Sequence, residues 1–283
     1  MPSLAHRSLT VELLDPDRHR SRLGHRYCWG GYIWQVHDAQ AGPLLTGTEW
    51  PEAEPDPYNG QGLPESFRHR ETTGAPLLWR GEAGLAPGAG VLALRDGVTH
   101  VTEPCIWHQE LDERRAVFRT RQAALGWAYE LERTVSLEGR TVRSATRYTN
   151  RGDTPLVHLW FAHPFFALGR DGRATITLPA GTSLAENPGY ALTGNQLHFR
   201  RAFQGKNDGH LDTLHLPPGV PLTATLSHPR LTGVTFSTDF APQRTIIWAN
   251  GNTVSVEPYL ALDLAPGEIK EWSLTYEFGP CSP

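Results

Sequence analysis

The sequence contains no apolar run approaching the roughly 18 residues that a membrane-spanning helix needs. Its first residues, 1–8, have no hydrophobic stretch of the kind that defines a secretory signal. It also has no block of lysine and arginine, and its formal net charge is −4. Nucleic acid and anionic membranes are therefore poor candidates as partners. These absences predict a cytoplasmic protein with no membrane segment.

Cysteine is scarce, with three residues at Cys28, Cys105 and Cys281. The odd number and the wide spacing predict free thiols in a reducing compartment, which again favours the cytoplasm. No Cys-x-x-Cys or His-Glu-x-x-His motif is present, so the sequence predicts no metal site. His158 and His163 are five residues apart, as are His210 and His215, and neither pair shares one face of a strand.

Motifs for nucleotide chemistry and for serine esterases are also missing. The sequence has neither Gly-x-Gly-x-x-Gly nor Gly-x-x-x-x-Gly-Lys-Ser/Thr, and it lacks Gly-x-Ser-x-Gly. We therefore expect no cofactor.

Hydrophobic periodicity of helix length is almost absent, whereas turn-forming residues are abundant, with 28 glycines and 23 prolines among 283 residues. Alternating patterns predict strands instead, and Asn250-Gly251 is a strong hairpin signal. No linker or repeat divides the chain, so we predict an all-β, large β-sandwich forming one domain over residues 1–283. The expected strands are 10–14, 31–36, 116–122, 129–137, 140–148, 156–162, 175–178, 222–226, 233–237, 244–248, 253–257 and 272–278.

The stretch from residue 150 to residue 166 organises the chemistry. Turn formers at 150–155 precede an apolar strand at 156–162, and Pro164 cannot donate to a ladder, so the strand should end at His163. An odd spacing places His158 and His163 on opposite faces. We expect His163 to face a cavity and His158 to be structural, although a core histidine bonded to a backbone carbonyl is an equal alternative for His163.

Glu257 resembles His163 in its position. Val254 and Val256 share one face of the second hairpin strand, and Ser255 and Glu257 lie on the other. Pro258 is expected to stop this strand directly after Glu257. A histidine and a glutamate that face one pocket can act as a general acid–base pair.

Two polar segments could bind hydroxyl groups. Residues 58–68, in the tail of a long loop that begins at 41, combine amide, carboxylate and guanidinium groups, although this composition also fits an ordinary turn. Residues 205–212 form a polar loop with two carboxylates, Asp208 and Asp212.

Several of these motifs, in this order, resemble the aldose 1-epimerase (galactose mutarotase) superfamily over residues 140–279. They are Tyr-Thr-Asn-Arg-Gly-Asp-Thr-Pro-Leu at 148–156, His-Pro-Phe-Phe at 163–166, Val-Ser-Val-Glu-Pro at 254–258, Leu-Ala-Pro-Gly-Glu at 264–268 and the strand at 272–278. The resemblance implies a β-supersandwich and an enzyme that interconverts the α and β anomers of an aldose without a cofactor. It also implies that His163 protonates the ring oxygen and that Glu257 takes the proton of the C1 hydroxyl.

The resemblance further suggests sugar-binding residues. Asp212 matches a family aspartate, with Asp208 as a competitor, and Gln61, Arg68 and Phe166 lie near expected polar or aromatic sugar contacts. The sequence departs from the family at 76–81, where many members carry a histidine and this chain has none.

Two alternatives stay open: a sugar-binding protein without catalysis, and a mutarotase for phosphorylated sugars that uses Arg68 and Arg70. The expected partner is a small-molecule sugar, and the residues specify neither which sugar nor an oligomeric state.

Overall fold

The described part of the chain is built from strands. A computed structural model describes residues 1–69 and 77–282, and within these ranges the only helical element is the 3-10 turn η1, Arg20–Arg22. None of the described residues belongs to a helix with the length and apolar character needed to cross a lipid bilayer. The all-β prediction is confirmed.

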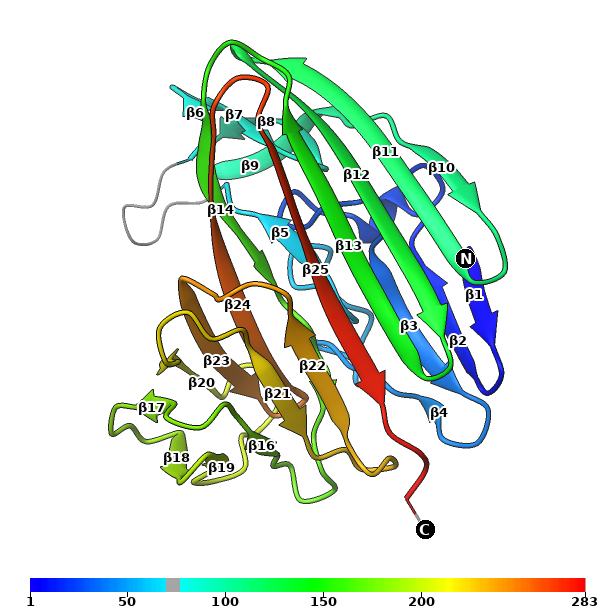
Figure 1. Ribbon diagram of the computed structural model, residues 1–283, viewed down its shortest axis with the longest axis vertical. Helices are drawn as coiled ribbons and strands as arrows, with labels where there is room; N and C mark the ends of the chain where they lie inside the picture. The colour runs from blue at the N-terminus through cyan, green and yellow to red at the C-terminus, as the bar shows by residue number, and fades with distance from the viewer. Residues whose placement is uncertain (70–76, 283) are drawn as a thin grey trace.

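A ten-stranded antiparallel sheet forms one layer, in the order β10-β11-β12-β13-β25-β22-β21-β16-β19-β18. Figure 1 shows β25 running between β13 and β22, although these strands come from distant parts of the chain. The bounds are β10 His108–Leu111, β11 Arg115–Ala124, β12 Trp127–Glu138, β13 Thr141–Asn150, β16 Thr175–Thr177, β18 Tyr190–Thr193, β19 Gln196–Phe199, β21 Thr223–Leu226, β22 Val234–Thr238 and β25 Ile269–Phe278.

A seven-stranded sheet forms the second layer, in the order β17-β20-β23-β24-β14-β5, with β15 also paired to β24. Its bounds are β5 Glu65–Phe67, β14 Leu156–Ala162, β15 Phe166–Ala167, β17 Ser183–Leu184, β20 Gly209–His215, β23 Arg244–Asn250 and β24 Thr253–Leu264.

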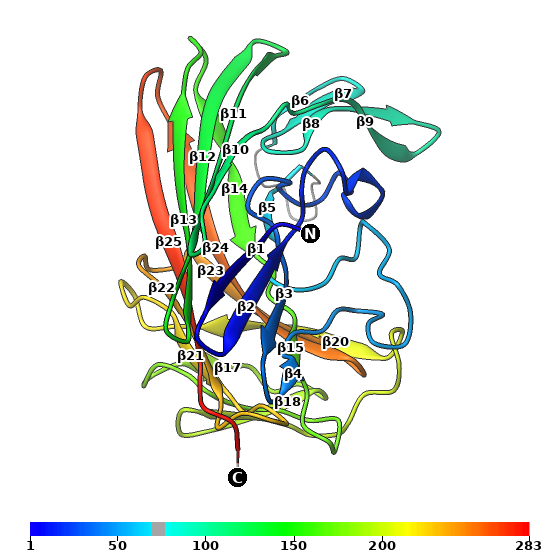
Figure 2. The same cartoon turned by 90° about the vertical axis from the view of Figure 1, so that its right-hand side faces the viewer.

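Two four-stranded sheets from the first part of the chain flank these layers, as Figure 2 shows. One consists of β1 Ser3–His6, β2 Leu9–Leu13, β3 Ile33–Asp38 and β4 Gly42–Pro43. The other consists of β6 Trp79–Arg80, β7 Ala83–Ala86, β8 Gly90–Arg95 and β9 Val98–Pro104.

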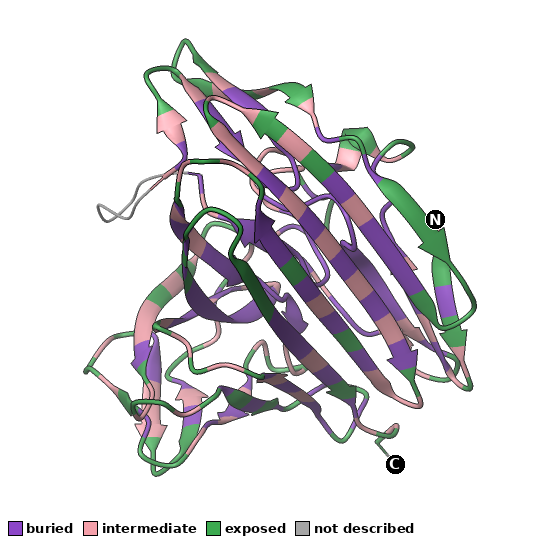
Figure 3. Ribbon diagram, turned by 45° about the horizontal axis from the view of Figure 1, so that its top comes forward, coloured by how far each residue is buried: buried purple, intermediate pink, exposed green. Residues whose placement is uncertain are grey.

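The two large sheets pack face to face through aromatic side chains. Trp160 of β14 lies 5.2 Å from Trp272 of β25 between ring centroids, and Phe67 of β5 lies 5.1 Å from Tyr148 of β13. Alternate residues of β12 and β13 are buried, which gives the banding visible in Figure 3. Burial on one face only is typical of antiparallel sheets, and it leaves the far face of the seven-stranded sheet available for a site.

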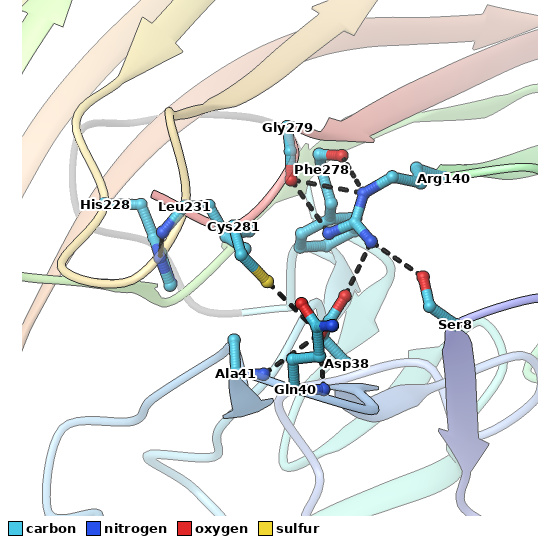
Figure 4. A network of polar contacts seen from close by, with 10 residues as sticks. All are labelled: Ser8, Asp38, Gln40, Ala41, Arg140, His228, Leu231, Phe278, Gly279 and Cys281. Atoms are coloured by element: carbon cyan, nitrogen blue, oxygen red, sulfur yellow. Dashed lines mark hydrogen bonds and ion pairs between the residues drawn. The ribbon is translucent and has the colours of Figure 1, made fainter. Parts of the chain in front are cut away.

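Arg140 connects the N-terminal sheet to the end of β25. Its guanidinium donates to Oδ2 of Asp38 at 2.6 Å and to Oγ of Ser8 at 2.8 Å, and it also donates to the carbonyl oxygens of Phe278 and Gly279 (Figure 4). Burial opposes ionisation of Asp38, but hydrogen bonds from Ala41, Arg140 and Gln40 lower the pKa of its carboxyl group below the usual range. Asp38 therefore stays ionised and holds the flanking sheet in place.

Most expected strands are present, with one informative exception. The hairpin through Glu138 and Gly139 and the hairpin through Asn250 and Gly251 form as expected. Pro258 was expected to end its strand, and this prediction was wrong, because β24 continues through it to Leu264. The pairing of β24 with β14 covers residues 264 to 259 of β24, so Pro258 lies just outside it. On that side β14 does not need an N–H group from residue 258, and a proline is therefore tolerated.

The three cysteines are unpaired, as expected, with Cys28 and Cys105 buried and Cys281 partly buried.

Candidate active site

The outer face of the seven-stranded sheet carries a cavity of about 590 Å³. Strand alternation selects the residues that face it, because Phe161, Ile246 and Trp248 line the cavity whereas Trp160 and Ile247 belong to the core. The lining residues are Arg26, Thr48, Tyr58, Asn59, Ser66, Arg68, His69, Phe161, His163, Leu211, Arg244, Ile246, Trp248, Glu257 and Tyr259.

His163 lies at the end of β14 and faces this cavity. Its backbone N–H donates to the carbonyl of Pro64, and its ring stacks on Phe165 with 4.4 Å between centroids. The edge of Trp248 covers another side, 5.8 Å away. On the third side Nδ1 lies 3.1 Å from Oγ of Ser255. These contacts fix the orientation of the ring.

Glu257 of β24 meets His163 just beyond the paired part of β14 and β24, which ends at Phe161 and Tyr259. Its Oε1 lies 3.3 Å from Nε2 of His163, and its Oε2 accepts a hydrogen bond of 3.4 Å from the hydroxyl of Tyr259. Both side chains are buried, with 4% of each residue exposed. A histidine and a carboxyl group thus share one contact at the base of a cavity.

The surroundings shift the pKa values of Glu257 and His163 in opposite directions. Burial raises the pKa of Glu257 to about 7, and the charge of Arg26 together with the Tyr259 hydroxyl limits this rise. Burial and the charge of Arg26 both lower the pKa of His163 well below its usual value. With Glu257 near 7 and His163 below it, the pair holds one proton in mildly acidic solution, and that proton resides on Glu257.

Aromatic rings and arginines complete the lining. The rings of Phe161 and Tyr259 are stacked 4.8 Å apart and nearly parallel. The guanidinium carbons of Arg68 and Arg244 lie 5.9 and 5.8 Å from the centroid of the Tyr259 ring. Arg26 lies against the ring of Tyr58 at 5.1 Å. Aromatic faces, guanidinium groups and amides are the groups with which proteins hold small polar ligands.

The structure brings some of the expected binding residues to the cavity. Arg68 lines it, together with Tyr58, Asn59 and Ser66 from the same polar segment. Arg70 lies outside the described residues.

Three other expected binding residues lie elsewhere. Gln61 is buried beneath the loop, where its side-chain amide donates to the carbonyl of Trp34 at 3.3 Å. Phe166 points to the ten-stranded sheet and contacts Phe236. Asp212 neighbours Leu211, which lines the cavity, so strand alternation turns the carboxylate to the opposite face, 3.6 Å from Nε2 of His210. Its competitor Asp208 is in an exposed ion pair with Arg201 and does not line the cavity either.

His158 lies in the core, as strand alternation indicated. Its Nε2 is 3.2 Å from the hydroxyl of Tyr148, and burial lowers its pKa to about 4. A different histidine, His69, lines the cavity from the end of the polar segment, and its Nε2 lies 3.1 Å from Nδ1 of His25.

Sequence analysis missed Arg26, Ser255 as a partner of His163, and Arg244 and Tyr259. The last two were detectable from even spacing along a strand. Arg244 shares a face with Trp248 in β23, and Tyr259 shares a face with Glu257 once β24 is continued through Pro258. Arg26 lies in an irregular segment and carries no such signal. Among the described residues no cluster of three or more histidine, cysteine or acidic side chains could hold a metal ion.

No protein-family profile and no curated protein sequence matches this chain. Solved structures do resemble it over nearly its whole length. A galactose mutarotase related enzyme from Lactobacillus acidophilus matches 99% of this chain and 97% of its own, with 13% identity and a TM-score of 0.63. A galactose mutarotase-like protein from Lactobacillus casei matches 98% and 99%, with 14% identity and a TM-score of 0.64. An aldose epimerase homologue from C. elegans matches 99% of both chains, with 12% identity and a TM-score of 0.51. At these identities the likeness establishes the fold, a galactose mutarotase-like sandwich, as the motifs indicated.

Proposed function

We propose that this protein interconverts the α and β anomers of an aldose, with His163 and Glu257 as its acid–base pair. The observation that carries the proposal is the 3.3 Å contact between Nε2 of His163 and Oε1 of Glu257 at the base of the cavity. The names of similar solved structures, which refer to mutarotases and an aldose epimerase, support the same reaction class.

The geometry suits this reaction because of where its two proton transfers occur. The ring oxygen and the C1 hydroxyl of an aldose are bonded to one carbon atom. An acid and a base that serve them must therefore be neighbours, as His163 and Glu257 are. A pair separated by a wide gap would suit two distant oxygens instead.

The reaction balances within the pair. Glu257 takes the proton of the C1 hydroxyl while His163 gives a proton to the ring oxygen. The bond from C1 to the ring oxygen breaks, and its electron pair stays on the ring oxygen as C1 and O1 form a carbonyl. Rotation about the bond from C1 to C2 exposes the other carbonyl face, and the reverse transfers close the ring as the second anomer.

One proton on the pair is sufficient for this cycle. In the empty cavity it resides on Glu257, and its transfer across the contact to His163 produces the carboxylate and imidazolium that the forward step requires. Ser255 accepts the Nδ1 proton of His163 in this state and so supports the imidazolium. Arg26 stabilises the carboxylate.

The other lining groups suit a sugar ring. Trp248 and Tyr259 offer apolar surfaces to the C–H faces of a pyranose, and Asn59 and Ser66 offer partners for its hydroxyl groups. The three unpaired cysteines agree with the proposed cytoplasmic location.

Saturation-transfer NMR between the anomers tests the proposal, with a panel of reducing sugars and the spontaneous rate subtracted. Glu257→Gln and His163→Asn should each lower the catalysed exchange by ~10²–10⁴-fold, the usual contribution of one acid or base. Glu186→Gln, an exposed control on a loop, should exchange at the rate of the parent protein.

Sugar binding is read on the same samples, and Glu257→Gln should retain it because an amide still bonds hydroxyl groups. Near-normal exchange in either variant refutes the assignment of the pair. A parent protein that binds sugars but never exceeds the spontaneous rate is a sugar-binding protein without catalysis.

A further inference from the structure

The charged residues that line the cavity are unbalanced. Among the described lining residues three are arginines, Arg26, Arg68 and Arg244, and only Glu257 is acidic. All three arginines are close enough to lower the pKa of Glu257. A site for an uncharged sugar needs hydrogen-bond partners but has no need of such an excess of cations.

Arg26 is accounted for by the acid–base pair. It is the foremost cation acting on both Glu257 and His163, and its guanidinium lies between the rings of Tyr27 and Tyr58, 5.0 and 5.1 Å away. Its charge therefore serves the carboxylate of Glu257. It does not account for the charge of Arg244.

Arg244 is placed differently. Glu257 pairs with Ile246 across the sheet, and Arg244 lies two residues further along β23, opposite Tyr259. At the rise of a β-strand, two residues correspond to about 7 Å. A sugar ring with C1 at the pair would thus direct its far end, the substituents on C5 and C6, towards Arg244.

Arg244 also lies between two hollows. It lines the first cavity and, together with Tyr259, an adjoining cavity of about 510 Å³. Arg244 is partly buried, and within the described residues no carboxylate is found within ion-pair distance of its guanidinium. Its described contact is with the Tyr259 ring. A partly buried guanidinium that faces a cavity without a close counter-ion can bind an anion, and an anionic ligand would supply this partner.

We propose that the substrate is a reducing aldose with an anionic substituent at the end remote from C1, and that Arg244 binds this anion. The inference rests on the proposed function for the position of C1. A phosphate or a carboxylate would satisfy the guanidinium, since both accept paired hydrogen bonds from its planar fork. Arg68 adds a second positive charge beside the same ring.

The test compares three sugars of one configuration: a hexose 6-phosphate, the hexuronate and the unsubstituted hexose. For each sugar, kcat/KM for anomer exchange is measured by NMR and the dissociation constant by calorimetry. The proteins are the parent, Arg244→Gln and Arg115→Gln. Arg115 is an exposed arginine of β11 outside the cavity, so its variant controls for the loss of one positive charge.

We expect the parent protein to favour at least one anionic sugar over the neutral hexose by ~10-fold or more in kcat/KM. Arg244→Gln should reduce this preference by ~10–100-fold, the usual effect of losing a hydrogen bond to a charged group. Arg115→Gln should leave it within about 2-fold. The relative rates of the phosphate and the uronate identify the anion.

The outcomes separate this inference from the proposed function. Equal or greater kcat/KM for the neutral hexose, or a preference that survives in Arg244→Gln, overturns the anion site while anomerase activity stands. Tight binding of an anionic sugar that depends on Arg244, without exchange above background, retains the anion site and refutes the enzyme. The absence of both binding preference and exchange refutes both.

Discussion

The hydroxyl oxygen of Ser255 lies 3.1 Å from Nδ1 of His163, on the side of the ring opposite Glu257. The three side chains form a line that begins and ends on β24, and the imidazole between them belongs to His163, the residue directly after β14. Because Ser255 does not line the cavity, we expect it to act through His163 as a positioning residue. Its contribution can be separated from that of the pair.

Ser255→Ala should lower kcat for anomer exchange by about 10-fold or more with little change in KM, since a hydrogen bond from a charged group such as the imidazolium is worth ~1.5–3 kcal/mol. The imidazolium of His163 would lose the acceptor for its Nδ1 proton, so the ¹⁵N resonances of the ring should report a changed tautomer balance. A merely structural role would instead lower the melting temperature and leave the tautomer balance unchanged.

The pH dependence should show a single proton on the pair. The pKa of Glu257 is raised to about 7 and that of His163 is lowered, so the singly protonated form exists below about pH 7 and is lost above it. We therefore expect kcat/KM to fall about tenfold per pH unit above pH 7. The measurement is exchange NMR from pH 5 to 9, corrected for spontaneous exchange. A rate that rises through pH 7 and stays high would show that an unprotonated pair is the active form.

The two histidines of this region should respond in opposite ways. His158→Gln breaks the contact with the buried Tyr148 hydroxyl and should lower the free energy of unfolding by ~1–3 kcal/mol, with kcat/KM within about 2-fold of the parent. His163→Asn should lower the catalysed exchange by ~10²–10⁴-fold and leave the melting temperature near that of the parent. Urea titrations and exchange NMR on both variants check this, and the reverse pattern would mean that the roles are exchanged.

Burial of Glu257 should make the protein less stable at alkaline pH. Its folded pKa, about 7, exceeds the unfolded value of 4.5, so the folded state binds more protons between these values. Stability is fully present below about pH 4.5 and is lost as the pH rises through 7, by an amount on the order of 3 kcal/mol. Urea titrations at pH 5 and 8.5 should show this loss in the parent and in Glu186→Gln. Glu257→Gln should show little of it, and an equal loss in Glu257→Gln would contradict the shift.

Period-two patterns and strand ends were sufficient for much of the fold and for the placement of His163 and Glu257 at one cavity. Alternation placed Glu257 on a polar face and separated His163 from His158, because successive side chains of a strand point to opposite faces. The strand end at Pro164 then indicated that His163 faces a cavity. The same rule, applied across Pro258, would have added Tyr259. We ended the strand there because proline cannot donate to a ladder, and the sequence does not show that β14 has already ended at this position.

The remaining site residues depend on contacts that no local pattern records. Asp212 is a carboxylate in a polar segment, but the register of β20 against β23 decides whether it faces the cavity. Leu211 pairs with the cavity residue Trp248, so Leu211 faces the cavity and Asp212 does not. Gln61 has the composition of a binding residue, yet its amide is used by the Trp34 carbonyl. Arg26 reaches the cavity from an irregular segment that only the folded structure places.

The position of β25 has a consequence for how the protein folds. This strand lies in the interior of the ten-stranded sheet, bonded to β13 on one side and to β22 on the other, and the whole of β14 to β24 separates it from β13 along the chain. Closing so large a loop carries an entropic penalty before any of these bonds form, and folds dominated by distant pairings are slow to form. Until β25 is inserted, β13 and β22 each present an unpaired edge that can bind strands of other chains. We therefore expect intermediates that lack this one strand to be prone to aggregation.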